Sequence, residues 1–175
     1  YWDHGAAKYV GNTLDRGSTI YGRADKRGKN FEAVDGSDVA FTNIVVLRAL
    51  EVGRDATTTQ ERKAQYDIIV KQIQVIYAQC ALRYARLIDE ALLYDSKLED
   101  LPKYRAEGRA FWNIISPWLR AKARSLTDSV QTKVWDLNVD PEKDVHAFCR
   151  VYELIEMLEL PEWEMGTLVA AAGVT

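Results

Sequence analysis

A long stretch without glycine or proline, residues 57–93, constrains the fold of this chain most. Its apolar residues recur in steps of three and four, which is the spacing of one buried face of an α-helix. These residues are Ile69, Ile73, Ile76, Cys80, Tyr84, Leu87 and Ala91. A helix of about 35 residues spans about 50 Å at 1.5 Å per residue, so it must form the backbone of a bundle or project from the domain.

Three further segments predict main helices. Pro102 suits the first turn of a second long helix, in which Pro117 should produce a kink because its ring removes a backbone donor. A third apolar pattern ends at Gly53, and a fourth ends at Pro161. The predicted ranges are 102–137, 38–53 and 141–160.

The first 37 residues form a front segment that glycines interrupt repeatedly. Residues 2–10 fit a short helix, and turns with a brief helix around Ala24 follow. No stretch alternates apolar and polar residues for long enough to predict a sheet. We therefore predict an all-α fold, a single domain of residues 1–175 in which a helical bundle of about four main helices (38–175) follows the glycine-rich front segment (1–37).

Length and composition agree with one compact domain and exclude some functions. A chain of 175 residues is large enough to bury a continuous core. A net charge of -3 and a pI near 5.5 argue against nucleic-acid binding, which normally needs a basic face. No apolar run reaches the roughly 18 residues of a membrane-spanning helix, and we expect no transmembrane segment. The start shows no signal segment, although a processed secreted protein would look the same.

Signatures of catalysis and of common metal centres are absent from the sequence. There is no nucleophile elbow, phosphate-binding loop, dinucleotide fingerprint or paired-histidine helix, so we predict a protein that is not an enzyme. Neither His4 nor His146 has the glutamate three positions earlier that a di-iron carboxylate bundle uses. Cys80 and Cys149 each lie among apolar residues at helical spacing, which predicts two small core residues rather than a disulfide.

The front segment gathers residue types that bind metals and anions. Oxygen and nitrogen ligands are available there, and a cationic run surrounds Asp25, so an oxyanion, alone or with a metal, is one predicted partner. The alternative is that the aromatic side chains pack in the core, Asp3 caps the first helix and the cations face solvent. Spacing alone leaves both open. The candidate ligands are Asp3, His4, Tyr9 and Tyr21, and the cations are Arg23, Lys26, Arg27 and Lys29.

Two acidic features also allow two interpretations each. Glu107, beside Gly108 in an otherwise apolar helix, faces either the core or the solvent. After Arg150 the chain carries only acidic charge, which indicates either a solvated helix face or docking to a basic protein partner. The glutamates of this acidic C-terminal region are Glu153, Glu156, Glu159, Glu162 and Glu164.

Three motifs together resemble a known family. They are WDHGAAKYVGNTL, IYGRADKRGKNF and YRAEGRAFWNIISPWL, and they resemble the algal iron-assimilation domain of the low-iron-inducible periplasmic proteins, which is also linked to phytotransferrins. A Leu-Arg-Tyr element at residues 82–84 adds to the resemblance. The resemblance implies a secreted, periplasmic or cell-surface protein of a photosynthetic alga that takes part in iron acquisition and binds ferric ion with carbonate.

The resemblance also implies roles for single residues. Tyr9 and Tyr21 would be phenolate ligands, Asp3 and His4 supplementary ligands, and Arg27 the carbonate partner. Ferric ion favours oxygen donors, and a guanidinium can hold carbonate through two parallel hydrogen bonds. The sequence departs from the family pattern at Gly28, where we expect a cysteine in relatives whose loop is stapled by a disulfide.

Two hypotheses of different class follow. The first is a metal-binding module for ferric ion with carbonate. The second is a metal-free structural or extrinsic subunit of a larger photosynthetic assembly, located in the lumen of an organelle. Its protein partner would bind through helix faces or the acidic C-terminal region, and the five tryptophans and long helices favour such contacts.

Overall fold

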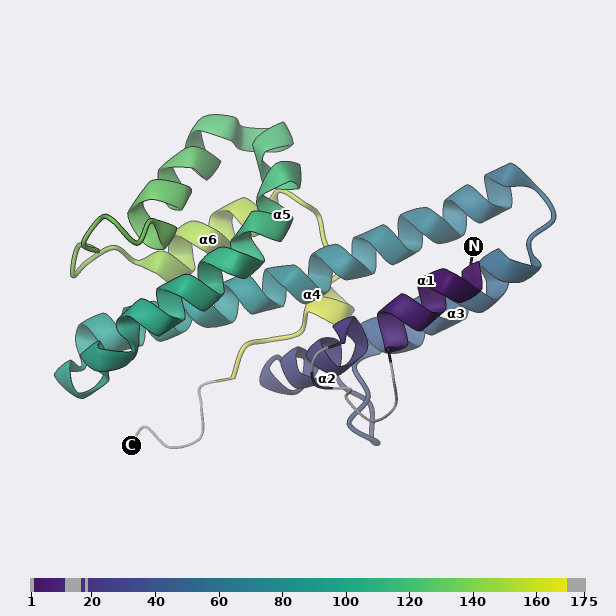
Figure 1. The fold of residues 1–175 in the computed structure, drawn as a ribbon, viewed down its shortest axis with the longest axis horizontal. Coiled ribbons are helices and arrows are strands. Elements are labelled where there is room, and N and C mark those ends of the chain that lie inside the picture. Colours follow the sequence, from purple (N-terminus) through teal and green to yellow (C-terminus); the bar gives the residue numbers. More distant parts are fainter. Residues whose placement is uncertain (1, 12–16, 18, 170–175) are drawn as a thin grey trace. The chain divides into compact units, whose positions relative to one another are not determined.

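The structure is a computed structural model of the chain and describes residues 2–11, 17 and 19–169. These residues form seven α-helices and no strand, which confirms the predicted all-α fold (Figure 1). The helices are α1 (Trp2–Val10), α2 (Ile20–Asn30), α3 (Phe41–Asp55), α4 (Thr59–Leu93), α5 (Leu101–Val130), α6 (Ala147–Glu156) and α7 (Glu162–Met165). A 3-10 helix, η2 (Asp95–Asp100), precedes α5, and a π-helical segment, η3 (Gln131–Trp135), follows it.

The chain divides into two compact units. Unit 1 comprises residues 1–76 and 161–175, and unit 2 comprises residues 77–160. Helix α4 contributes its first part to unit 1 and its second part to unit 2. The single domain of residues 1–175 stays a prediction. Across the described ranges, no helix combines the length and the apolar character that crossing a membrane requires.

Helix α4 starts where its sequence provides a capping box. The Glu61 backbone N–H donates to the Thr58 hydroxyl at 3.1 Å, and the Thr58 backbone N–H donates to the Glu61 carboxylate at 3.0 Å. This reciprocal pair satisfies backbone donors that the first turn of a helix leaves open. Further along, residues 78–82 are buried without interruption. This part of α4 is therefore buried on more than the single apolar face that the sequence predicted.

The break in the second long helix lies at Ala123 and not at Pro117. Ala123 has φ -146° and ψ 73°, whereas Pro117 lies within the helical run. Figure 1 shows α5 turning back on itself. The Thr127 hydroxyl donates a hydrogen bond of 2.8 Å to the Ala123 carbonyl, which satisfies this backbone carbonyl at the break.

Helix α3 continues through Gly53 and ends at Asp55, so the predicted stop at Gly53 is wrong. Gly53 instead allows the Trp2 ring to lie close to the backbone of α3. A Cβ atom added there would lie 2.6 Å from Cζ3 of the Trp2 indole, closer than any real contact of this kind. Gly53 therefore lets α1 and α3 pack against each other.

Helix α6 begins at Ala147, six residues after the predicted start at Pro141. His146 precedes it with φ 47°, and its side chain forms no capping hydrogen bond. The cap comes from α4, because the Asp89 carboxylate accepts hydrogen bonds from the backbone N–H groups of Ala147 at 2.7 Å and Phe148 at 2.9 Å. A carboxylate also suits the positive end of a helix dipole.

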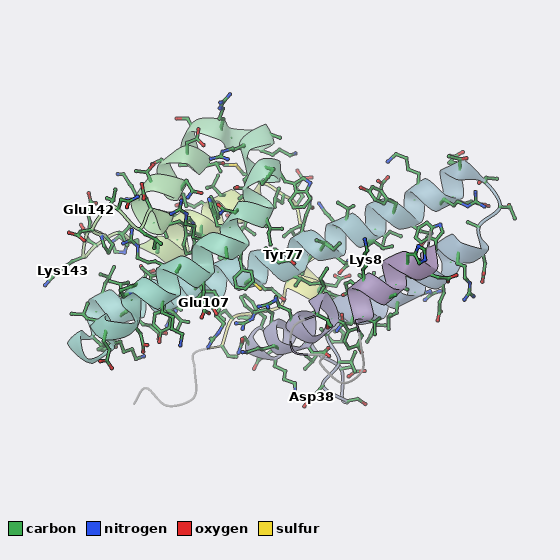
Figure 2. The ribbon with its side chains drawn as sticks, in the orientation of Figure 1. Lys8, Asp38, Tyr77, Glu107, Glu142 and Lys143 are labelled. Atoms are coloured by element: carbon green, nitrogen blue, oxygen red, sulfur yellow. The ribbon has the colours of Figure 1, made fainter. Side chains whose placement is uncertain are left out.

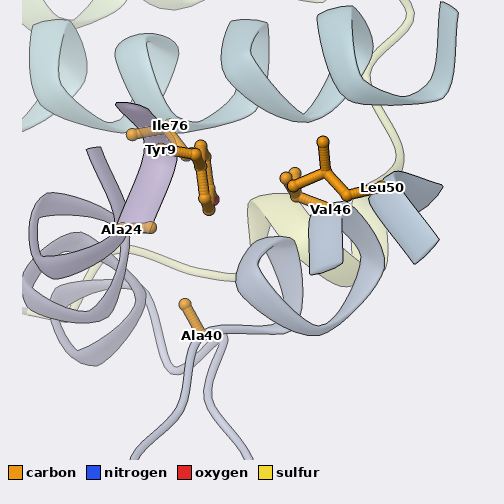
Figure 3. Packing of buried hydrophobic residues seen from close by; sticks show 6 residues of the cluster. All are labelled: Tyr9, Ala24, Ala40, Val46, Leu50 and Ile76. Atoms are coloured by element: carbon orange, nitrogen blue, oxygen red, sulfur yellow. The ribbon is translucent and has the colours of Figure 1, made fainter. Parts of the chain in front are cut away.

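The core of unit 1 forms where α1, α2 and α3 meet the first part of α4 (Figure 3). Its buried members are Tyr9, Ala24, Ala40, Val46, Leu50 and Ile76. The final segment of the chain also joins this unit. The Thr167 N–H donates to the Phe31 carbonyl at 2.7 Å, and Val169 donates to Asn30 at 3.0 Å.

The core of unit 2 is built around two tryptophans. Trp112 of α5 and Trp135 of η3 are fully buried, with ring centroids 6.0 Å apart. Cys80 is buried as predicted, but Cys149 is exposed on α6, so the core prediction for it is wrong. Both cysteines are free thiols, in agreement with the predicted absence of a disulfide.

Candidate functional site

A chain of hydrogen bonds in unit 1 joins α1, α2 and α3. The Tyr9 hydroxyl donates to Asn43 Oδ1 at 2.6 Å, and Asn43 Nδ2 donates to Asp25 Oδ1 at 2.6 Å. Asp25 Oδ1 also accepts from the Ala40 backbone N–H at 2.9 Å, directly before α3. Tyr9 is 4 % exposed and Asn43 is fully buried. The carboxylate thus supplies a cap to α3 that the side chain of Ala40 cannot supply.

The second predicted phenolate ligand lies beside this chain of hydrogen bonds. The rings of Tyr9 and Tyr21 meet edge to face, with centroids 6.2 Å apart. The Tyr21 carbonyl accepts a hydrogen bond of 3.0 Å from Asn43 Nδ2. Two of the four predicted metal ligands are therefore neighbours, and Asp25 joins them through Asn43.

The other two predicted ligands lie on α1 with exposed side chains. Asp3 is in the first turn of α1, inside the helix rather than before it, and His4 follows it. Within the residues that the structure describes, no group of three or more His, Cys, Asp and Glu side chains gathers in a geometry that could hold a metal ion.

The cationic run of the front segment lies on α2, and its residues differ in exposure. Arg27 is 2 % exposed, and its Nη1 donates a hydrogen bond of 3.0 Å to Asn30 Oδ1. Lys29 is exposed and pairs with Asp38 at 2.7 Å, whereas Lys26 is simply exposed. Arg27, the predicted carbonate partner, is therefore buried and already donates to a neighbouring side chain.

Gly28 lies inside α2, not in the predicted loop, and it is buried. A Cβ atom there would lie 2.9 Å from the Ala40 Cβ and 3.0 Å from the Ala33 carbonyl oxygen. Neither neighbour has a flexible side chain that can move aside. The fold of this chain consequently favours glycine over the cysteine that the family pattern suggests at this position.

Glu107 faces neither the core nor the solvent completely. Its side chain is half-buried in unit 2, and its carboxylate accepts a short hydrogen bond from the Tyr84 hydroxyl. Phe111 stacks on Tyr84 with a centroid distance of 5.6 Å and also contacts the Tyr77 ring. The structure thus brings together the Leu-Arg-Tyr and Glu-Gly-x-x-Phe elements, which are far apart in the sequence.

The acidic C-terminal region is largely solvated. Four of its glutamates are exposed, while Glu164 is half-buried. Glu164 accepts a hydrogen bond of 3.4 Å from Gln72 within unit 1. The exposure fits a solvated face, and it leaves docking to a basic partner as a prediction.

An apolar pocket adjoins the hydrogen-bonded chain in unit 1. It has a volume of about 340 Å³, and helices α1, α2, α3 and the first part of α4 line it. Val46, Leu50 and Ile73 form part of its wall, and Tyr9, whose hydroxyl donates to Asn43, also lines it. Among the described residues, Lys8 is the one charged side chain in its lining.

The sequence did not identify Asn43 or Asp25 as members of the site. A signal for Asn43 exists, because it is the lone carboxamide in an apolar helical pattern and burial requires a partner for it. Asp25 was visible only as a counter-charge within the cationic run. Its contact with α3 depends on tertiary structure.

Comparison of the chain with protein-family models, with curated proteins and with solved structures finds no match. The iron-assimilation family therefore stays a prediction that depends on the motifs alone.

Proposed function

We propose that this chain is a non-enzymatic helical protein whose front segment has a structural role, and that it acts as a metal-free subunit of a larger assembly. The observation that supports this proposal is the chain of hydrogen bonds from Tyr9 through Asn43 to Asp25. These bonds use the phenol and the carboxylate to join three helices of unit 1.

Metal binding would disrupt that chain. A phenolate ligand must lose its proton and with it the hydrogen bond to Asn43, which would leave a buried amide oxygen without this donor. Leaving a buried polar group unsatisfied costs about 1–3 kcal/mol. The present arrangement therefore favours a structural role for Tyr9.

An exposed aromatic surface supports the assembly part of the proposal. Trp163 of α7 is 72 % exposed and stacks on Phe41 of α3 with a centroid distance of 5.0 Å. Both residues belong to unit 1. Exposed tryptophans are enriched where proteins contact one another, because the ring offers a large apolar area at a low cost in conformational entropy.

A second candidate function is binding of ferric ion with carbonate. It is favoured by one observation, the approach of the Tyr9 and Tyr21 rings beside Asp25. Two phenols and a carboxylate are oxygen donors of the kind that ferric ion prefers. The carbonate and its partner Arg27 depend on the family resemblance alone.

Titration with ferric ion separates the two candidates. We expect no tyrosinate-to-iron absorption band with or without bicarbonate, because the hydroxyl of Tyr9 is committed to Asn43. Visible absorption spectroscopy of the native chain gives the measurement.

A bicarbonate-dependent band that disappears in both Tyr9→Phe and Tyr21→Phe would instead establish the ferric site and contradict the metal-free proposal. Tyr66→Phe is the matched control, since Tyr66 is 59 % exposed and outside the hydrogen-bonded chain.

The assembly role predicts that the chain elutes from size-exclusion chromatography of native extracts in a complex larger than its own 19.9 kDa. Trp163→Ser should shift it towards the monomer position, because the exposed indole is lost. Leu98→Ser, at a 43 % exposed position in unit 2, is the control. Elution of the native chain as a monomer would count against the proposal.

A further inference from the structure

We propose that the apolar pocket of unit 1 is a binding site for a medium-chain alkyl carboxylate, held with its chain between α1, α3 and α4 and its carboxylate against Lys8. This inference goes beyond the structural role proposed above and does not depend on it. Three observations support it: the size of the pocket, its lining and the single charge in that lining.

The volume matches a linear chain of moderate length. The pocket measures about 340 Å³. Since a methylene group fills roughly the volume of a water molecule, about 30 Å³, the space accommodates about eleven such groups. The alkyl chain of dodecanoate, with eleven carbon atoms beyond its carboxyl carbon, is close to this size.

The wall of the pocket is aliphatic where the chain would lie. Val46 and Leu50 point from α3 toward α4 (Figure 3), and Ile69 and Ile73 approach from α4. Tyr9 lines the pocket, but its hydroxyl donates to Asn43. The interior therefore offers contacts for methylene groups and little to a polar ligand.

The charge in the lining selects the head group. Lys8 is exposed on α1 (Figure 2) and reaches the pocket, so its ammonium group can lie at the opening. None of the ion pairs found among the described residues includes Lys8. A carboxylate at the end of the alkyl chain would complement this ammonium group, while a cationic head group would be repelled.

Calorimetric titration of the native chain with octanoate, decanoate and dodecanoate, each below its micelle concentration, tests the proposal. We expect saturable binding of one molecule, with affinity rising roughly tenfold for each added pair of methylene groups. Dodecanol should bind at least fivefold more weakly than dodecanoate, because it lacks the charge. Absence of saturable dodecanoate binding, or equal affinity for dodecanol, would overturn the assignment.

Two variants locate the ligand. Gly5→Leu should lower dodecanoate affinity at least tenfold by filling the pocket, and α1 should tolerate it because a Cβ at Gly5 meets only the Leu50 Cδ2, at 3.8 Å. Lys8→Glu should lower the affinity about fivefold or more and improve binding of dodecyltrimethylammonium.

Lys26→Glu is the matched control, since it makes the same charge change at an exposed position of α2 outside the pocket lining. Circular dichroism confirms that each variant is folded. Unchanged dodecanoate affinity in folded Gly5→Leu would show that the ligand lies elsewhere. Equal effects of Lys8→Glu and Lys26→Glu would show that Lys8 does not hold the carboxylate.

Discussion

Replacing Gly108 with alanine is expected to lower the free energy of unfolding by about 3 kcal/mol, although alanine favours helix formation more than glycine does. A Cβ atom at this position of α5 would overlap Cζ3 of the Trp135 indole and lie 2.9 Å from the Tyr84 Cβ. Trp135 is fully buried, so its ring cannot turn out into solvent to make room. Denaturant unfolding followed by circular dichroism measures the change.

Two further variants identify the overlap as the cause. Gly108→Ala combined with Trp135→Phe should lose less stability than the sum of the single changes, because the smaller ring gives the new methyl group space. Gly5→Ala should be neutral or slightly stabilising, since a Cβ there has only the Leu50 contact at 3.8 Å. An additive double variant, or equal losses at Gly108 and Gly5, would contradict the packing argument.

Replacing Arg105 with methionine is the second change with a large expected effect, a loss of about 3 kcal/mol in the free energy of unfolding. The guanidinium of Arg105 donates to the carbonyl groups of Val134 at 3.2 Å and Val139 at 2.7 Å, and to that of Asp136. Burial lowers the pKa of Arg105. Methionine keeps the apolar stem but removes the guanidinium donor from all three carbonyls, of which that of Asp136 keeps the Val139 backbone N–H at 3.3 Å.

Arg109→Met is the matched control for this prediction. Arg109 lies one turn further along α5, is half-buried and forms none of these bonds. Its replacement should change stability by less than about 0.5 kcal/mol. Similar losses for the two variants in thermal or denaturant unfolding would show that the hydrogen bonds of Arg105 do not hold the segment after η3.

The helices were predictable because their signals are local. The stretch free of glycine and proline in α4 and the threonine and glutamate at its start specify that helix within a few residues. Boundaries that depend on distant contacts were predicted wrongly. Gly53 looks like a helix stop in the sequence, but it is a packing position for Trp2, which lies far earlier in the chain.

In the candidate site too, local features were predictable and contacts between distant residues were not. Tyr9 and Tyr21 could be named from residue type, and they are neighbours in the structure. Asn43 has a sequence signal as a carboxamide in an apolar pattern, but its partner Asp25 could not be identified because the hydrogen bond between them crosses from one helix to another. The apolar pocket has the same origin, since four helices contribute to its lining and no single segment of sequence contains its pattern.

The cap of α6 has a consequence for the order in which unit 2 folds. A ten-residue helix is too short to be stable alone, and His146 provides no local cap for it. Its first backbone N–H groups gain their acceptor only when Asp89, 58 residues earlier, is in place. Closing so long a loop costs chain entropy before any bond forms. Helix α6 should therefore form only after the second part of α4 has folded. Folding of unit 2 would then begin with α4.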